Sequence, residues 1–333
     1  MNTEKLFFHT GKTRLGYALD FLIALAPVFI WGVFAFGARV ITICIISVLF
    51  CFLFDFLFYR FALHYPLNLC FDPFNAVFGF LTAFMMPVAV PLWIPVIGAL
   101  FCVFAKNFRV IGNKRFFNPY VFSAFMLNVL FSGYMTRFTK PFAYFSAFTF
   151  SLDDALVKGY RVLSPLQYMA GGKVYEDGVL AQFYGYSAGC IGEIAVAAVL
   201  IGFIWLLVRK RVSFGNTLSF LAVVAVLAAI FPMKEAETSY YVYAFLLSGG
   251  TVFLSVFAMN EGGSVPGTQF GGYVFGILCG GIYFALRSIF SGAESLYMAV
   301  LLMNVAAPFL SYITRERPFG EPKKKKVKAG AHR

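Results

Sequence analysis

This chain contains few charged residues. Only 13% of its 333 residues are Asp, Glu, Lys or Arg, whereas 60% are hydrophobic and 20% are aromatic. A soluble domain carries about 25% charged residues. The scarcity of charge therefore excludes an ordinary soluble fold. It predicts an integral membrane protein whose aromatic residues serve lipid-facing surfaces and membrane interfaces.

Metal-binding motifs are missing as well. The six cysteines are scattered through apolar sequence and form neither a Cys-x-x-Cys motif nor a Cys/His set, so we predict no metal site. No glycine-rich dinucleotide fingerprint follows a strand. The polar segment Met1–Arg14 precedes a full-length apolar span without a cleavage-type ending, and no cleavable signal peptide is therefore expected.

Ten apolar segments approach the length of about 20 residues that a membrane-spanning helix needs. Five precede a long polar stretch and five follow it. The segments are Leu15–Phe36, Val40–Phe61, Phe74–Val90, one ending near Ala105, Asn118–Tyr134, Cys190–Val208, Leu218–Pro232, Tyr240–Ala258, Gly272–Leu286 and Leu296–Ile313. The predicted fold class is an all-α integral membrane protein with about ten transmembrane helices.

Lysine and arginine residues gather on one side of these spans. With the N-terminus in the cytoplasm, that side carries the loop Lys106–Phe117, Arg209–Arg211 and the run Lys323–Lys326. The short loops of the other side carry only Arg39, Lys234 and Arg287. This bias predicts that both termini are cytoplasmic. We interpret the lysine run as an anchor on the cytoplasmic leaflet of the membrane and expect no nucleic-acid partner.

The polar stretch divides the chain into two halves. We predict a first five-helix half (1–134), an extracytoplasmic loop (135–188), a second five-helix half (189–314) and a basic cytoplasmic tail (315–333). Five is an odd number of spans, so two similar halves would be inverted in the membrane. Inverted repeats with broken helices place binding sites near the membrane midplane.

The junction after the loop, Tyr184–Glu193, reads YGYSAGCIGE. Its small residues, among them Gly189 and Gly192, would let the backbone approach a ligand or a neighbouring helix closely. Glu193 lies at the mouth of the following span, where an unpartnered acid is costly. Either a functional role or a place at a helix N-terminus, stabilised by the helix dipole, would explain it.

Polar residues elsewhere in the spans are further candidates. Asp55 is the deepest acid, Glu294 opens the last span, and Asn118 and Asn304 lie within or at the ends of spans. Because a charge at the bilayer centre costs at least about 2.5 kcal/mol, Asp55, Glu294 and Asn304 are predicted as parts of an ion pathway. The alternative for Glu294 is again a helix cap.

Several short motifs occur in a familiar order along the chain. They are Leu22–Pro27 with Gly37–Arg39, PVAVPLW at Pro87–Trp93, GNKRFFNP at Gly112–Pro119, GCIGE at Gly189–Glu193, LSGG at Leu247–Gly250, and LLMNVAAP at Leu301–Pro308. With these motifs the chain resembles the D subunit of the Rnf electron-transport complex and the homologous B subunit of the sodium-translocating NADH:quinone reductase.

The resemblance implies a ten-helix subunit that binds flavin. In that family FMN is usually esterified to a threonine of an outer loop shortly before the GSIGE segment. Here the best match is Ser164, followed by Pro165-Leu166, with Arg161-Val162-Leu163 in place of the usual Ser-Gly-Ala. An exposed Ser164 hydroxyl is the candidate FMN attachment point, with Arg161, Gly189, Gly192, Glu193 and Asn118 as candidate flavin-binding residues; the replaced Ser-Gly-Ala speaks against covalent attachment. Non-covalent FMN or riboflavin is the alternative.

The implied function is that of a membrane subunit of an ion-translocating oxidoreductase. It would pass electrons through flavin, couple them to ion movement and work with the other subunits of an Rnf/Nqr-like complex. NADH would be oxidised on one of those subunits. Two alternatives stay open: a small-solute transporter on the same scaffold, and a structural subunit without flavin.

Overall fold

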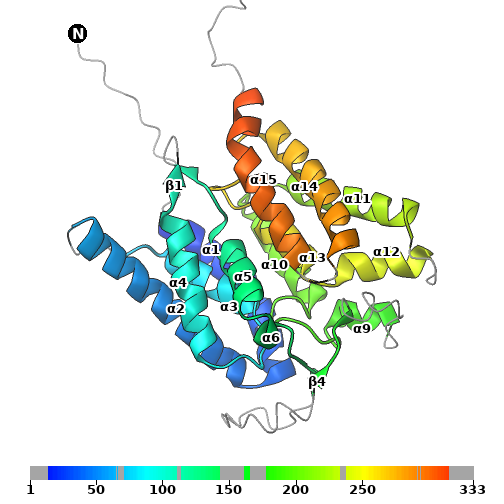
Figure 1. The fold of residues 1–333 in the computed structure, drawn as a ribbon, viewed down its shortest axis with the longest axis horizontal. Helices are drawn as coiled ribbons and strands as arrows, with labels where there is room; N and C mark the ends of the chain where they lie inside the picture. The colour runs from blue at the N-terminus through cyan, green and yellow to red at the C-terminus, as the bar shows by residue number, and fades with distance from the viewer. Residues whose placement is uncertain are drawn as a thin grey trace, which may run out of the picture.

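The computed structural model describes residues 14–64, 66, 71–110, 114–142, 161–165, 178–232, 238–290, 292 and 294–314. These residues form an almost entirely helical protein (Figure 1). Two antiparallel pairs of two-residue strands are the exceptions: β1 (Arg109–Val110) with β2 (Lys114–Arg115), and β3 (Phe138–Thr139) with β4 (Arg161–Val162).

The helices fall into two groups along the chain. The N-terminal group comprises α1 (Arg14–Phe36), α2 (Arg39–Leu57) with its π-helical end η1 (Phe58–Ala62), α3 (Phe74–Phe84), α4 (Trp93–Asn107), α5 (Pro119–Leu130) and α6 (Ser132–Met135). The C-terminal group comprises α9 (Gly178–Tyr184), α10 (Val196–Val208), α11 (Phe214–Ile230), α12 (Thr238–Leu247), α13 (Thr251–Phe257), α14 (Gln269–Ile289) and α15 (Glu294–Ile313).

Only some of the ten expected spans are single long helices. In the described part of the chain, four helices are long and apolar enough to cross a membrane: α1, α2 with its π-helical end, α14 and α15. A fifth span is possible if α12 and α13, bent by 50° at their break, count as one. The expected spans at 74–90, up to Ala105, 118–134, 190–208 and 218–232 correspond to shorter apolar helices of 10–17 residues. Together they fit an all-helical, multi-pass membrane protein.

Two of the expected spans are shorter because their ends form irregular backbone. The span at Phe74–Val90 becomes helix only to Phe84, since Pro87 and Pro91 cannot continue it. The span expected from Cys190 begins as helix only at Val196. The amides of Ile191 and Gly192 donate to the carbonyls of Met86 (3.1 Å) and Phe84 (2.8 Å). The two irregular segments thereby satisfy each other inside the protein, the setting in which a membrane protein tolerates them.

The two groups pack their helices in a similar order. In the N-terminal group α2 packs on α3 and α4, and α4 packs on α5; in the C-terminal group α11 packs on α13 and α14, and α14 packs on α15. The groups meet where α1 contacts α10 and where α5 contacts α15 (Figure 1). The α1–α10 contact is close: a Cβ added to Gly202 would lie 2.1 Å from the Ala24 carbonyl oxygen.

Large apolar side chains cover much of the outer surface. Phe34 and Val208, for example, are 68% and 72% exposed. Such apolar faces are abnormal for a soluble monomer and typical of helices that face lipid.

Candidate functional site

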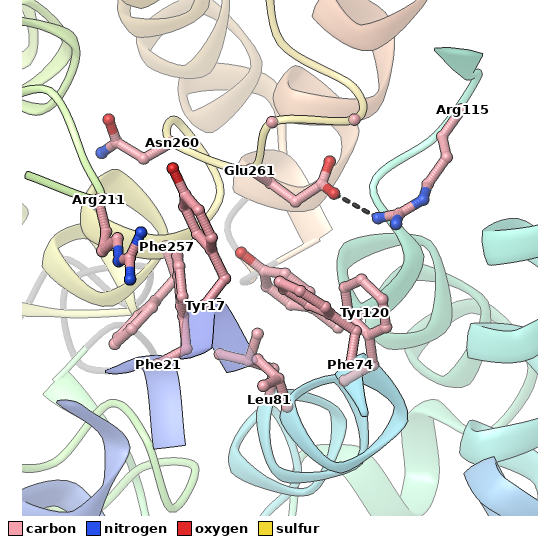
Figure 2. Close-up of a pocket in the computed structure, with 14 residues that line it drawn as sticks. Tyr17, Phe21, Phe74, Leu81, Arg115, Tyr120, Arg211, Phe257, Asn260 and Glu261 are labelled. Carbon is pink, nitrogen blue, oxygen red and sulfur yellow. Dashed lines mark hydrogen bonds and ion pairs between the residues drawn. The ribbon is translucent and has the colours of Figure 1, made fainter. Parts of the chain in front are cut away.

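A cavity of about 420 Å³ lies where the two helix groups meet. Its wall draws on α1, α3, α5, the end of α13 and the loop that follows α13 (Figure 2). The lining residues are Tyr17, Phe21, Phe74, Val77, Phe78, Leu81, Arg115, Tyr120, Arg211, Phe257, Asn260, Glu261, Gly262 and Gly263. The volume lies within the range of about 300–1,000 Å³ that is usual for small-molecule sites.

The inner part of this cavity is aromatic and apolar. Val77, Phe78, Leu81, Tyr120 and Phe257 are buried. The ring of Phe21 on α1 lies 6.5 Å from both the Phe74 and the Phe257 rings, so one aromatic edge joins the two helix groups. A wall of this kind favours a flat, largely apolar ligand.

Two buried polar groups at the cavity lack partners. Tyr120 is 0% exposed, and its hydroxyl lies near the Asn118 amide but makes no hydrogen bond of good geometry with it or with any other described residue. The Arg211 side chain is 4% exposed, and its Nη1 is likewise unpartnered within the described part of the chain. Leaving a buried polar group unsatisfied costs about 1–3 kcal/mol. Arg211 Nη1 can only donate, and the Tyr120 hydroxyl can donate or accept, so the two groups indicate a ligand or water molecules that present polar atoms here.

Charged side chains form the more exposed rim. On one side Arg115 Nη1 donates to Glu261 Oε1 at 2.5 Å, which joins the two helix groups (Figure 2). On the other side Asp20 accepts from Arg209 Nε at 3.0 Å and from Arg211 Nε at 2.5 Å. The Arg211 guanidinium also lies 3.7 Å from the centre of the Tyr17 ring. The rim thus carries ion pairs on both sides.

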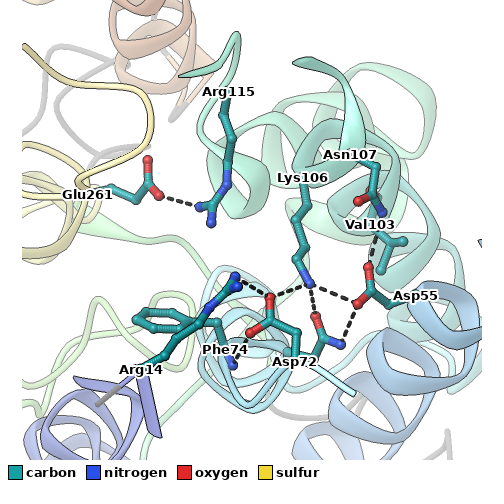
Figure 3. A network of polar contacts seen from close by, with 10 residues as sticks. Arg14, Asp55, Asp72, Phe74, Val103, Lys106, Asn107, Arg115 and Glu261 are labelled. Atoms are coloured by element: carbon teal, nitrogen blue, oxygen red, sulfur yellow. Dashed lines mark hydrogen bonds and ion pairs between the residues drawn. The ribbon is translucent and has the colours of Figure 1, made fainter. Parts of the chain in front are cut away.

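Asp55, predicted for an ion pathway, lies in a different cluster (Figure 3). Lys106 Nζ lies 2.9 Å from Asp55 Oδ2 and 2.8 Å from Asp72 Oδ2, and donates to Asn75 Oδ1 at 2.5 Å. Asn75 and Asn107 donate to the two Asp55 oxygens at 2.8 and 3.0 Å. Asp55, Asn75 and Lys106 are buried on α2, α3 and α4. Every one of these groups is partnered, and the cluster ties three helices together.

The junction residues Gly189, Gly192 and Glu193 lie in the interior near the Ser248–Gly250 break. A Cβ on Gly192 would lie 2.9–3.1 Å from Phe84 and Phe253 atoms, so close packing explains this glycine. Glu193 lies before the first residue of α10 and does not serve as its N-cap, which is Ala195. Its Oε2 accepts from the Cys190 amide at 3.2 Å, while its buried Oε1 has no partner in the described residues.

Asn118 and Asn304 lie next to each other, although nearly 190 positions separate them in the sequence. Asn118 is the N-cap of α5, where its Oδ1 accepts from the Val121 amide. With its amide oriented to suit its neighbours, Asn304 accepts from the Asn118 amide at 2.9 Å and donates to the Ser264 carbonyl at 3.3 Å. The pair joins α5 to α15. Glu294 is the first residue of α15, the position that the helix-cap alternative assigned to it.

The predicted flavin-attachment loop is described only in part. Most of residues 135–188, including Lys158, Lys173 and Glu176, lies outside the described residues, as does the tail 315–333. Arg161 is described only through its backbone in β4, opposite Thr139. Ser164 is 4% exposed, whereas we expected an exposed hydroxyl. The expected exposure was wrong because a Ser-Pro pair predicts a turn at the surface, and the sequence does not show which residues cover that turn.

No sequence motif marks the cavity. Tyr17 and Phe21 lie one turn apart on α1, and Tyr120 and Arg211 lie on two distant parts of the chain. Two sequence features lie next to cavity residues: the GNKRFFNP motif directly precedes Tyr120, and the polar tripeptide Asn260-Glu261-Gly262 contains Glu261. Neither shows that these segments converge on one space.

Curated proteins with similar sequences cover most of the chain. The D subunit of the ion-translocating oxidoreductase complex of Stutzerimonas stutzeri is 28% identical over 326 residues, 91% of each chain. The D subunit of the Na(+)-translocating ferredoxin:NAD(+) oxidoreductase complex of Acetobacterium woodii is 29% identical over 259 residues, 76% of this chain and 75% of that one. The D subunit of an Escherichia coli ion-translocating oxidoreductase complex is 28% identical over 270 residues, 74% and 77% of the two chains.

The family model described as "NQR2, RnfD, RnfE family" matches residues 2–320, nearly the whole length of the chain. The resemblance that the ordered motifs indicated is therefore confirmed: this chain belongs to the NQR2, RnfD, RnfE family.

Proposed function

We propose that this chain is a membrane subunit of an Rnf/Nqr-type ion-translocating oxidoreductase in a bacterial cytoplasmic membrane. Membership of the family over residues 2–320 supports the proposal. So do the names of the relatives, each the D subunit of an ion-translocating complex. Because those names describe one component of a complex, we expect this chain to work with other subunits.

We further propose that the subunit holds a flavin, FMN or riboflavin, in the cavity between the helix groups. The observation that carries this proposal is the unpartnered Tyr120 hydroxyl in an aromatic cavity. Phe21, Phe74 and Phe257 would flank the ring system, and Tyr120 and Arg211 would donate to its carbonyl and nitrogen acceptors. When bound, a flavin accepts and passes on electrons. The protein contributes a water-poor wall and fixed donors.

Covalent attachment at Ser164 is a separate proposal. Burial of Ser164 and the loss of the usual Ser-Gly-Ala favour non-covalent binding. Intact mass spectrometry of the native chain and of Ser164→Ala, both from cells with an active flavin transferase, tests it. An FMN-sized increment that is lost in Ser164→Ala would establish the ester, and an unmodified native chain would exclude it.

The inverted-repeat topology is also proposed. The matching packing of α2, α4 and α5 on one side and α11, α14 and α15 on the other supports it. A charge-based orientation with both termini in the cytoplasm goes with this topology. Cysteine labelling at Lys173 and Lys324 tests that orientation and should give opposite sides of the membrane.

Coupling to ion movement is proposed for Glu193, whose Oε1 is buried and unpartnered within the described chain. Glu193→Gln keeps the size of the side chain and removes its charge. Turnover of the assembled complex should fall while assembly persists. Equal losses of assembly and turnover would indicate a structural role.

Flavin content decides between the proposed function and its alternatives. Visible absorbance of the purified chain, followed by fluorescence of the supernatant after denaturation, separates bound, released and covalent flavin. Released flavin in a stoichiometric amount supports the cavity proposal. A colourless chain that assembles with its partners would favour a structural subunit, and a colourless chain that works alone would favour a solute transporter.

A further inference from the structure

The Arg115–Glu261 ion pair differs from the Asp20 ion pairs at the cavity because neither of its residues lies on a helix. Arg115 belongs to β2, after α4, and Glu261 to the loop between α13 and α14. Both residues line the cavity, and their side chains are 17% and 11% exposed. The inner lining residues Tyr120 and Phe257 are 0% and 1% exposed. The pair therefore lies at the outer end of the cavity and bridges the two helix groups there.

Each side chain of the pair makes a further contact that restricts its conformation. Glu261 Oε2 accepts from the Ser264 amide at 2.9 Å and from the Ser264 hydroxyl at 2.7 Å. The Arg115 guanidinium lies 5.0 Å from the centre of the Phe78 ring on α3. Because these contacts already restrict the rotamers, little side-chain entropy is lost when the two charges meet.

The opposite rim of the cavity is built differently. Asp20 and Arg211 have side-chain exposures of 5% and 4%, and Asp20 lies within α1 and accepts from two arginines. Asp20 precedes Ala24 by one turn of α1, and the Ala24 carbonyl lies close to Gly202 on α10. Breaking the Asp20 pairs would leave charge buried, whereas Arg115 and Glu261 can turn to water when they separate. The Asp20–Arg211 side of the rim is therefore fixed, whereas the Arg115–Glu261 side can open.

We propose that Arg115 and Glu261 form a latch that controls access to the cavity: with the pair made, the mouth between the helix groups is narrowed, and with the pair broken, small polar molecules reach the inner wall more readily. The space for this lies at the side chains and not in the loop backbone: nothing lies within 4 Å of an added Cβ at Gly262, next to Glu261, whereas Ser264 and Val265 further along the loop are buried. That the molecule admitted is a flavin rests on the proposed function. The latch itself does not.

The test measures access directly, without any ligand. Leu81, on the inner wall, is replaced by cysteine in a full-length chain that also carries Cys70→Ser. The five other native cysteines are buried and line no part of the cavity. The rate at which a small, water-soluble methanethiosulfonate reagent modifies Leu81→Cys reports how often the mouth is open. The parent without Leu81→Cys gives the background.

Glu261→Gln keeps the shape of the side chain and removes its charge. We expect it to raise the labelling rate by about 1.5-fold to fivefold, the range that loss of an exposed ion pair produces. The swap Arg115→Glu with Glu261→Arg should lower the rate again. The control is Arg137→Gln, which removes a cation that lies 4.6 Å from the centre of the Tyr134 ring; neither residue lines the cavity, and the rate should be unchanged.

Salt provides a second measurement. Because the pair is partly exposed, labelling of Leu81→Cys with the native latch should speed up as ionic strength rises, while the Glu261→Gln rate stays flat. Equal rates with and without Glu261→Gln, or an equal rise in Arg137→Gln, would overturn the latch. If Glu261→Gln raises the labelling rate in a chain that does not bind flavin, the latch is supported and the flavin proposal is refuted.

Discussion

Two buried polar regions of this protein differ in one respect. Around Lys106, every charge and amide has its partner: Asp55, Asn75, Asp72 and Asn107 complete one network. Around the cavity, the Tyr120 hydroxyl and Arg211 Nη1 have none among the described residues. Both regions are polar, and both lie between helices.

The difference separates architecture from binding. A satisfied network has no donor left for a ligand, and its loss exposes charge to an apolar interior, so it holds the fold. An unsatisfied donor in a cavity costs stability unless something else completes it. By this criterion we interpret Asp55, the deepest acid, as a structural residue in this conformation, and we propose Tyr120, which follows GNKRFFNP and lines the cavity, as a ligand-binding residue.

The largest effect is expected from Lys106→Met. It leaves Asp55 and Asp72 without their shared cation, and removing one partner of a buried pair costs roughly 3–5 kcal/mol. Thermal unfolding in detergent should show a large loss of stability, or little folded protein. Arg14→Gln, which removes a cation that is 60% exposed from Asp72, should cost less than about 1 kcal/mol. Comparable losses in both variants would contradict the contrast.

Gly192→Ala tests whether the junction belongs to the architecture. The added methyl would lie 2.9–3.1 Å from Phe84 and Phe253 atoms, and overpacking of this kind costs about 1–3 kcal/mol. Gly281→Ala on α14 meets nothing within 4 Å and should be neutral or slightly stabilising. Flavin content per folded chain should be unchanged in both. Loss of flavin from a stable Gly192→Ala protein would instead place the ligand at the junction.

Tyr120→Phe removes one unsatisfied hydroxyl. The ligand-free protein should be as stable as the native chain or more stable by about 1 kcal/mol, while flavin affinity falls about threefold to tenfold. Tyr297→Phe is the matched control, because Tyr297 is also fully buried with an unpartnered hydroxyl in the described chain but does not line the cavity. Equal affinities in the two variants would remove Tyr120 from the site.

The smallest effect concerns acid. Burial raises the pKa of Asp72, but the Lys106 ammonium and Arg14 outweigh it, and the net pKa lies below the usual value. A carboxyl with a lowered pKa stabilises the fold above its unfolded pKa of about 3.9 and loses that contribution as pH falls through its folded pKa. Asp72→Asn should therefore lose less stability than the native chain below about pH 4. Parallel acid-unfolding curves would contradict this.

Sequence patterns predicted the class and much of the helix order. Low charge and apolar length indicated a helical membrane protein, and the ordered motifs indicated its family. The prolines at 87 and 91 marked the true end of α3, yet the span was extended to Val90 because irregular backbone paired inside a protein has the same hydropathy as helix. The break at Ser248–Gly250 was hidden for the same reason.

The site was less accessible to sequence reasoning. Asp55 was singled out because an intramembrane acid is costly, but its cost is met by Lys106, a residue 51 positions away. Tyr120 was overlooked because tyrosine is common in membrane proteins and its missing partner is visible only in three dimensions. Whether a buried polar residue is satisfied depends on long-range packing, which no local pattern encodes.

The most direct test of the account fills the cavity. Leu81→Trp places a bulky ring in the inner wall, and Leu100→Trp adds the same ring at a position that is 48% exposed on α4. Releasable flavin per folded chain is then measured in the native protein and both variants. The account predicts flavin in the native chain and in Leu100→Trp, and its loss from a folded Leu81→Trp protein. Equal flavin in all three chains, or none in the native chain, would contradict it.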